Sequence, residues 1–115
     1  MLEAIEKFLS KEEKTLFDLK QFYETVDPDK IILTTHSSDG IGLTCKVNEL
    51  VFMFAPANLY AKTSFGVINL LGVDRICSSR LIDTDEPFIN FGIMLKGAKV
   101  YHDLTLYFSP NYLND

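Results

Sequence analysis

Two histidines and two cysteines are the side chains of this sequence that could take part in the widest range of chemistry. His36 and His102 lie far apart in the sequence, and neither has the neighbouring ligands that a zinc site requires. Cys45 falls in an alternating apolar segment, which predicts a packed thiol rather than an activated nucleophile. Cys77 stands outside any CxxC motif. The sequence therefore predicts no catalytic residue and no metal site.

Two polar segments resemble ligand-binding loops only superficially. Residues 83–87 (DTDEP) gather three carboxylates, but a calcium loop distributes its ligands over about twelve residues, so this segment predicts a solvated hairpin turn. Residues 37–40 (SSDG) lack the glycine spacing and the lysine of a phosphate-binding loop. No cofactor is therefore expected.

Composition limits the class of protein. The 115 residues predict a single domain over residues 1–115, and a hydrophobic fraction of 47% is sufficient for a core. The net charge of −5 and the scattered lysines and arginines disfavour nucleic-acid binding. The sequence contains no apolar run of about 18 residues, no signal-peptide pattern and no disulfide framework, so a cytoplasmic location without a membrane span is expected.

Hydrophobic spacing predicts a helical segment at the N-terminus. Residues 2–25 are expected to be helical, with a break near Ser10, where Ser10 and Glu13 could form a capping box. Pro28 ends this segment, because the residue before a proline avoids helical backbone angles. The apolar residues at spacings of three and four are Leu2, Ile5, Leu9, Leu16, Leu19 and Tyr23.

Strand patterns predict a three-stranded antiparallel meander at residues 30–36, 41–47 and 50–55. Residues 30–36 are rich in β-branched side chains, residues 41–47 alternate, and the apolar run of residues 50–55 indicates burial on both faces. Two more strands are expected at residues 75–83 and 88–97. The tail is expected to form a short helix that begins near His102 and is stopped at Pro110, although its alternation is also compatible with a sixth strand.

Residues 58–71 predict a central helix, with Asn58 as its N-cap and Gly72 at its end. Gly66 within a helix costs about 1 kcal/mol relative to alanine, which would be explained by the close approach of another backbone. Apolar residues surround much of this helix, so a second copy of the chain is expected to cover it. The predicted fold is α+β: a five-stranded, mostly antiparallel sheet with an N-terminal helical segment, a central helix and a short C-terminal element.

The element order, size and acidity resemble the type III secretion chaperones, which escort effector proteins to the bacterial injection apparatus. The class that serves several effectors is the most similar. The resemblance covers residues 30–108, and four segments carry it. Residues 41–55 are similar to the family's second and third strands, residues 60–71 to its central helix, residues 81–97 to its fourth and fifth strands, and residues 100–108 to the start of its last helix.

The resemblance implies a non-enzymatic homodimer of the bacterial cytoplasm, without a cofactor, that binds the N-terminal region of secreted effector proteins and contributes to virulence. Strand addition at a sheet edge is one way to hold such a segment. The dimer contacts implied by the resemblance are Leu59, Ala61, Phe65 and Ile68. The effector contacts implied by it are Leu16, Leu19, Phe22 and Ile32.

Two features depart from the family, and two other functions are open. The N-terminal segment is long and broken near Ser10, and the expected C-terminal helix is short. One alternative is a small-ligand carrier in which His36 or His102 binds haem iron. The other is a profilin-like dimeric scaffold domain, which also places a central helix against an antiparallel sheet.

Overall fold

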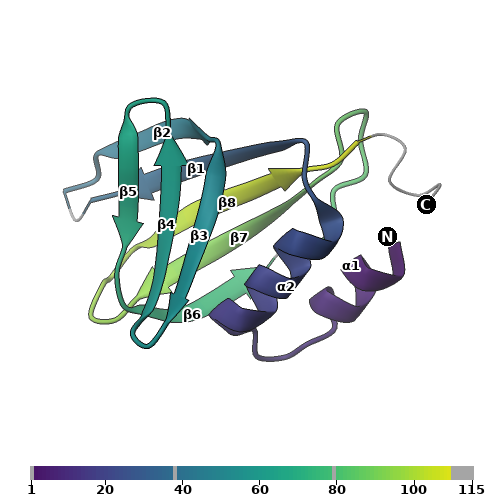
Figure 1. The fold of residues 1–115 in the computed structure, drawn as a ribbon, viewed down its shortest axis with the longest axis horizontal. Helices are drawn as coiled ribbons and strands as arrows, with labels where there is room; N and C mark the ends of the chain where they lie inside the picture. Colours follow the sequence, from purple (N-terminus) through teal and green to yellow (C-terminus); the bar gives the residue numbers. More distant parts are fainter. Residues whose placement is uncertain (1, 38, 79, 110–115) are drawn as a thin grey trace.

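The computed structural model describes residues 2–37, 39–78 and 80–109 and contains two helices followed by eight strands (Figure 1). The α+β class and the N-terminal helical segment are confirmed. The elements are α1 (Leu2–Leu9), α2 (Leu16–Val26), β1 (Lys30–His36), β2 (Gly42–Val47), β3 (Glu49–Phe54), β4 (Ala57–Thr63), β5 (Gly66–Leu70), β6 (Val73–Ser78), β7 (Phe88–Leu95) and β8 (Tyr101–Tyr107).

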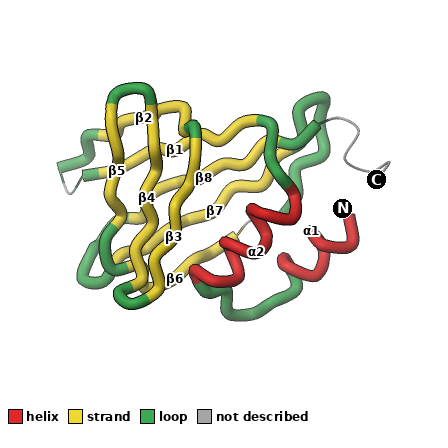
Figure 2. Tube along the Cα trace, in the orientation of Figure 1, coloured by secondary structure: helices red, strands yellow, loops and turns green. Residues whose placement is uncertain are grey.

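The strands form two antiparallel sheets that make two layers. The larger sheet has the strand order β2-β1-β8-β7-β6, and the smaller one has the order β3-β4-β5. The smaller sheet and the two helices lie side by side over the same face of the larger sheet (Figures 1 and 2). The chain passes between the sheets at Asn48, which joins β2 to β3, and again between β5 and β6.

The core lies between these layers. Phe8 of α1 and Phe22 of α2 stack with ring centroids 4.5 Å apart, and both pack edge-on against Phe91 of β7. Each buried apolar side chain of this size stabilises the fold by roughly 1.5–3 kcal/mol. Strand alternation directs the buried residues of the larger sheet toward this layer: Ile31, Leu33, Val47, Ile76, Ile89, Phe91, Ile93, Leu104 and Leu106.

A capping box fixes the start of α2. The hydroxyl of Thr15 accepts a hydrogen bond from the backbone N–H of Asp18, and the Asp18 carboxylate accepts one from the backbone N–H of Thr15. The predicted break in the helical segment is therefore confirmed, but the capping box is at Thr15 rather than at Ser10. Asp27 ends α2 with a left-handed backbone, φ 44°, just before Pro28.

The central helix predicted at residues 58–71 is wrong, because this segment forms the hairpin of β4 and β5. Leu59 and Ala61 are two residues apart and both point into the core, which is strand rather than helix periodicity. Asn58 is not an N-cap; its side-chain oxygen accepts a hydrogen bond from the backbone N–H of Gly72. The hairpin turn is held by the Thr63 hydroxyl, which donates to the carbonyl of Gly66.

Three of the predicted elements differ from the strands that the structure contains. A five-stranded sheet is present, but the strand predicted at residues 50–55 belongs to the second sheet, as β3. The tail forms β8 rather than a helix, and its alternating residues pair on both sides, with β1 and β7. The strand predicted at residues 75–83 ends earlier, at Ser78.

Replacement of Gly66 with alanine distinguishes the hairpin from the predicted helix by the sign of its effect. Gly66 has φ +137°, a conformation that residues with a side chain rarely adopt. We therefore expect Gly66→Ala to lower the free energy of unfolding by about 1–3 kcal/mol, although no atom blocks the added methyl group. In a helix the same change would raise it by about 1 kcal/mol. Urea unfolding of both proteins measures the difference, and a stabilised variant would contradict the hairpin.

Candidate functional site

The helical end of the molecule covers two of the four sheet edges. Helix α2 lies beside β3 (Figure 1), where Phe17 packs against Phe54 and Tyr23 against Phe52, with ring centroids 5.7 and 5.8 Å apart. The loop between the helices covers β6, since Lys14 forms an isolated antiparallel bridge with Ile76. These two edges are therefore protected within one chain.

The other two edges, β2 and β5, lack such protection. Within residues 2–37, 39–78 and 80–109, no strand pairs with the outer edge of either one. Both lie at the end of the molecule opposite the helices (Figure 1). An unpaired edge exposes backbone N–H and C=O groups that can pair with another chain.

Four exposed apolar side chains lie on or next to these two edges. Phe65, in the turn between β4 and β5, is 98% exposed, and Val67 on β5 is 53% exposed. Ile41 and Leu43, at the start of β2, are 69% and 60% exposed. We call this surface, the edges of β2 and β5 with these four side chains, the open end. Exposed apolar groups beside an unpaired edge are typical of a binding surface.

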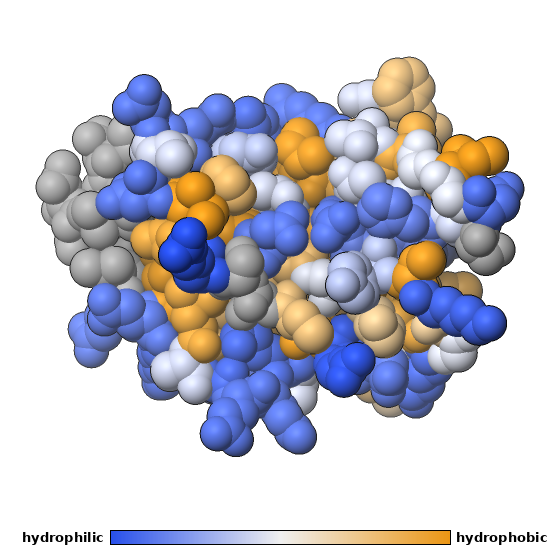
Figure 3. Space-filling model, turned by 180° about the vertical axis from the view of Figure 1, so that it is seen from behind, coloured by the Kyte–Doolittle hydropathy of each residue, from blue (hydrophilic) through white to orange (hydrophobic). Residues whose placement is uncertain are grey.

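The outer face of the larger sheet is a weaker candidate, because its polar side chains bond to one another. Seen from behind, its apolar groups are separated by hydrophilic ones (Figure 3). Thr34 and Thr44 share a hydrogen bond of 2.9 Å, and the Asn90 side chain donates to the Thr105 hydroxyl at 2.8 Å. These cross-strand pairs stabilise the sheet and leave few polar groups for a ligand.

The two histidines lie near the open end, His36 at the end of β1 and His102 near the start of β8. The His36 ring contacts Asp103 on β8, with 3.0 Å between Nε2 and Oδ2, and the backbone N–H of His36 donates to Nδ1 of His102 at 3.1 Å. Burial lowers the pKa of His102, the charge of His36 lowers it further, and the carboxylate of Asp103 partly opposes both effects. Both rings therefore have protein partners. Among the described residues, no group of three or more His, Cys, Asp or Glu side chains could hold a metal ion.

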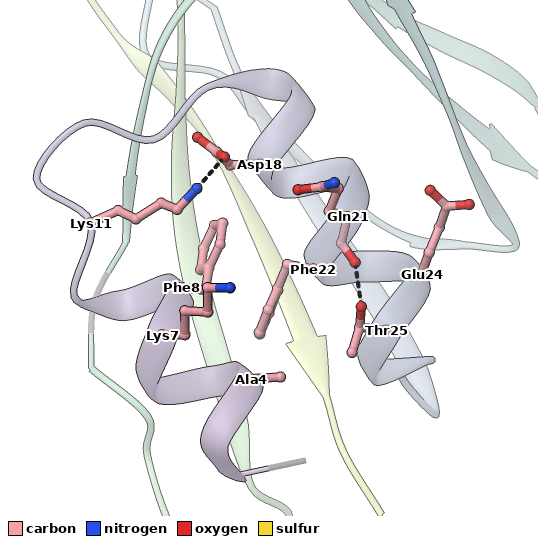
Figure 4. Close-up of a pocket in the computed structure, with 9 residues that line it drawn as sticks. All are labelled: Ala4, Lys7, Phe8, Lys11, Asp18, Gln21, Phe22, Glu24 and Thr25. Atoms are coloured by element: carbon pink, nitrogen blue, oxygen red, sulfur yellow. Dashed lines mark hydrogen bonds and ion pairs between the residues drawn. The ribbon is translucent and has the colours of Figure 1, made fainter.

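The two helices enclose a groove of about 510 Å³ (Figure 4). Phe8 and Phe22 form its apolar wall, and Lys11 and Asp18 form an ion pair of 2.6 Å at its rim. The Lys11 ammonium and then the backbone N–H of Thr15 hold the pKa of Asp18 below its usual value. The groove thus combines an apolar wall with a charged rim, and the ion pair between Lys11 and Asp18 occupies part of that rim.

The residues predicted to contact an effector do not form one surface. Leu16, Leu19 and Phe22 are buried in the core of the chain, although Phe22 also lines the helix groove. Ile32 is half-buried and alternates with the inward-facing Ile31 and Leu33, so it points to the opposite face of the sheet.

The predicted dimer contacts are divided in the same way. Leu59 and Ala61 are fully buried beneath the smaller sheet, which makes them inaccessible to a partner. Ile68 is half-buried and packs against the core. Phe65 is the one member of this set that is almost fully exposed.

Sequence analysis did not identify Ile41 and Leu43 as surface residues. They alternate with the buried Val47, so the pattern predicts one buried face for the whole strand. The sequence TSFG, residues 63–66, contained the signal for the exposed turn, because serine, threonine and glycine are turn formers.

Comparisons of the chain with protein-family models, with curated proteins and with solved structures found no match. In the described part of the chain, neither helix has the length and apolar character needed to span a bilayer. Functional inference therefore depends on the geometry of the open end.

Proposed function

We propose that this protein is a non-enzymatic binding domain that holds an extended segment of a partner protein at the open end, by strand addition to β5. The observation that carries this proposal is the unpaired edge of β5 beside a phenylalanine that is 98% exposed. The backbone of the partner would pair with β5, and its apolar side chains would contact Phe65 and Val67.

The composition of β5 supports its choice over β2. Proteins usually protect an exposed edge with charged side chains, prolines or bulges. The sequence of β5, GVINL, contains no charge and no proline, whereas β2 contains Lys46. An edge without such protection accepts a partner strand at low cost. The net charge of −5 favours a neutral or basic segment over an acidic one.

More specific predictions concern the identity of the partner. A chaperone for type III effectors in the bacterial cytoplasm would use the same surface to hold an unfolded N-terminal region. However, the dimer through a central helix is not carried forward, because residues 58–71 form a hairpin. A homodimer would instead pair two copies of β5 about a twofold axis, which is a second use of the same edge.

Photo-crosslinking in the cell of origin tests the proposal. A photoreactive amino acid at position 65 should form an adduct with one partner segment, and mass spectrometry maps that segment. The matched control places the same group at Phe17, which is half-exposed at the helical end. Val67→Lys should abolish the adduct at position 65, because it adds a charge to β5. Adducts of equal yield at both positions, or none at position 65, would contradict the proposal. An adduct with a second copy would identify the homodimer.

Phe65→Asp should separate binding from stability. Because Phe65 is almost fully exposed, we expect the substitution to change the free energy of unfolding of the protein by less than about 0.5 kcal/mol. Loss of an aromatic anchor that is buried in a complex reduces the free energy of binding by about 2 kcal/mol or more, which corresponds to a roughly 30-fold larger dissociation constant. Titration of the crosslinked partner segment, as a synthetic peptide, measures this change. Unchanged affinity would exclude Phe65 as the anchor.

A further inference from the structure

One side-chain hydrogen bond extends the pairing between β1 and β8 beyond the end of their ladder. The paired positions of these strands end at Thr34 and Asp103. Two residues later, the backbone N–H of His36 donates to Nδ1 of His102 at 3.1 Å. Beyond His36 the chain enters the turn that leads to β2 and the exposed Ile41 and Leu43. This bond therefore fixes the base of the β1–β2 hairpin at the open end.

The direction of the bond sets the protonation state of His102. A backbone N–H can only donate, so Nδ1 of His102 must carry a lone pair and the ring must be neutral, with its hydrogen on Nε2. The imidazolium carries a hydrogen on both nitrogens. Protonation of His102 therefore removes the acceptor and breaks the bond.

The second contact of this cluster does not depend on protonation in the same way. Nε2 of His36 lies 3.0 Å from Oδ2 of Asp103. Nε2 can donate to the carboxylate both in one neutral tautomer of His36 and in its cation. Protonation of His102 thus breaks the bond that the His36 backbone donates and leaves the contact between the His36 ring and Asp103 in place.

The surroundings of His102 favour its neutral form. Burial and the neighbouring His36 lower its pKa, against the opposing effect of Asp103. The residue opposite His102 on β7 is the apolar Ile93, and Gly42 of β2 lies against the His36 ring. The nearby turns contribute Asp39, whose carboxylate bonds to the Ser37 hydroxyl and the backbone N–H of Ile41, and the exposed Lys99. At pH 7 the bond is therefore intact.

We propose that His102 is an acid-sensitive clasp that holds the β1–β2 hairpin in place at neutral pH and releases its base when the ring is protonated. Release of the hairpin moves Ile41 and Leu43 relative to β5 and weakens binding of the partner segment. This second effect rests on the proposed function. The lowered pKa of His102 also sets how the stability of the folded chain depends on pH. In the unfolded chain residue 102 binds a proton near pH 6.5, and in the folded chain it does so only at lower pH. The stabilisation is therefore complete above pH 6.5 and is lost as the pH falls from that value through the lower pKa of the folded chain.

Nuclear magnetic resonance of the free protein tests the clasp directly. A nitrogen–nitrogen coupling through the hydrogen bond should connect the His36 amide with Nδ1 of His102 at pH 7.5. The coupling should disappear over the same pH range in which the His102 ring shifts report protonation. Absence of the coupling at pH 7.5, or its persistence after the ring is protonated, would overturn the proposal. This measurement needs no partner, so its failure is distinct from a failure of the binding proposal.

Two variants assign the effect. In His102→Asn, the amide oxygen takes the place of Nδ1 and does not titrate. The change in the His36 amide chemical shift that accompanies protonation of His102 in the wild type should therefore be absent from this variant. In His36→Gln, the backbone donor remains, and the coupling from residue 36 should still be lost on acidification. If binding of the partner peptide weakens between pH 7.5 and 5.5 in the wild type but not in His102→Asn, the clasp regulates the open end. Equal weakening in both proteins would exclude that role.

Discussion

Phe91→Ala should lower the free energy of unfolding by about 3–5 kcal/mol. Phe91 is fully buried, and its ring is the common partner of Phe8 and Phe22. Truncation removes the ring contacts of β7 with Phe8 and Phe22 and leaves a cavity where the three rings meet. For a domain of ordinary stability, about 5–15 kcal/mol, this loss is a large fraction of the total.

Denaturant unfolding followed by circular dichroism measures this effect. Phe65→Ala is the matched control, because it removes the same ring from a position that is 98% exposed. Its free energy of unfolding should change by less than about 0.5 kcal/mol. Similar losses in the two variants would mean that the helices do not pack on β7 as described.

Leu59→Ala should cost about 2–5 kcal/mol, because Leu59 lies on β4, the central strand of the smaller sheet, and is fully buried. The side chain points between the sheets, where no solvent can replace the lost atoms. The resemblance to the secretion chaperones implied a different result. If Leu59 lay at a dimer interface, its truncation would weaken the dimer, and the loss of stability would depend on protein concentration.

Unfolding of Leu59→Ala at several protein concentrations distinguishes these two results. We expect a destabilisation that does not vary with concentration. Val67→Ala is the control within the same hairpin, since Val67 is half-exposed on β5 and should change the free energy of unfolding by less than about 0.5 kcal/mol. A loss that increases as the protein is diluted would place Leu59 at an interface between chains.

Local sequence patterns were sufficient for the parts of the fold in which local and global preferences agree. The apolar spacing of residues 2–25 and the proline at position 28 predict the helical segment and its end. Residues 30–36 are rich in β-branched side chains, and they form β1.

Residues 58–71 could not be assigned from local patterns. Ala61, Phe65 and Ile68 satisfy helical spacing, while Leu59 and Ala61 satisfy strand spacing. The choice depends on the neighbours that β4 finds in β3 and β5, and such pairing overrides intrinsic preference. Gly66 is the residue that favours the hairpin, because its cost in a helix disappears at a turn with positive φ.

The open end depends on contacts between residues that are distant in the sequence. Alternation predicts that Ile41 and Leu43 share a face with Val47, but it does not predict where the covering sheet ends. His36 and His102 are separated by 66 positions and meet only because β8 pairs with β1. Neither relation has a local signal, so the candidate site could be recognised only from the structure.

The position of β8 has a consequence for synthesis of the protein. The last strand of the described residues, β8 (Tyr101–Tyr107), lies in the middle of the larger sheet, between β1 and β7. A growing chain on the ribosome therefore contains β1 long before β8 exists, and the larger sheet cannot close until residues 101–107 have been translated. Such long-range closure is slow compared with local pairing. During that interval the edges of β1 and β7 that later pair with β8 remain open, which makes the growing chain most prone to aggregation before β8 has been made.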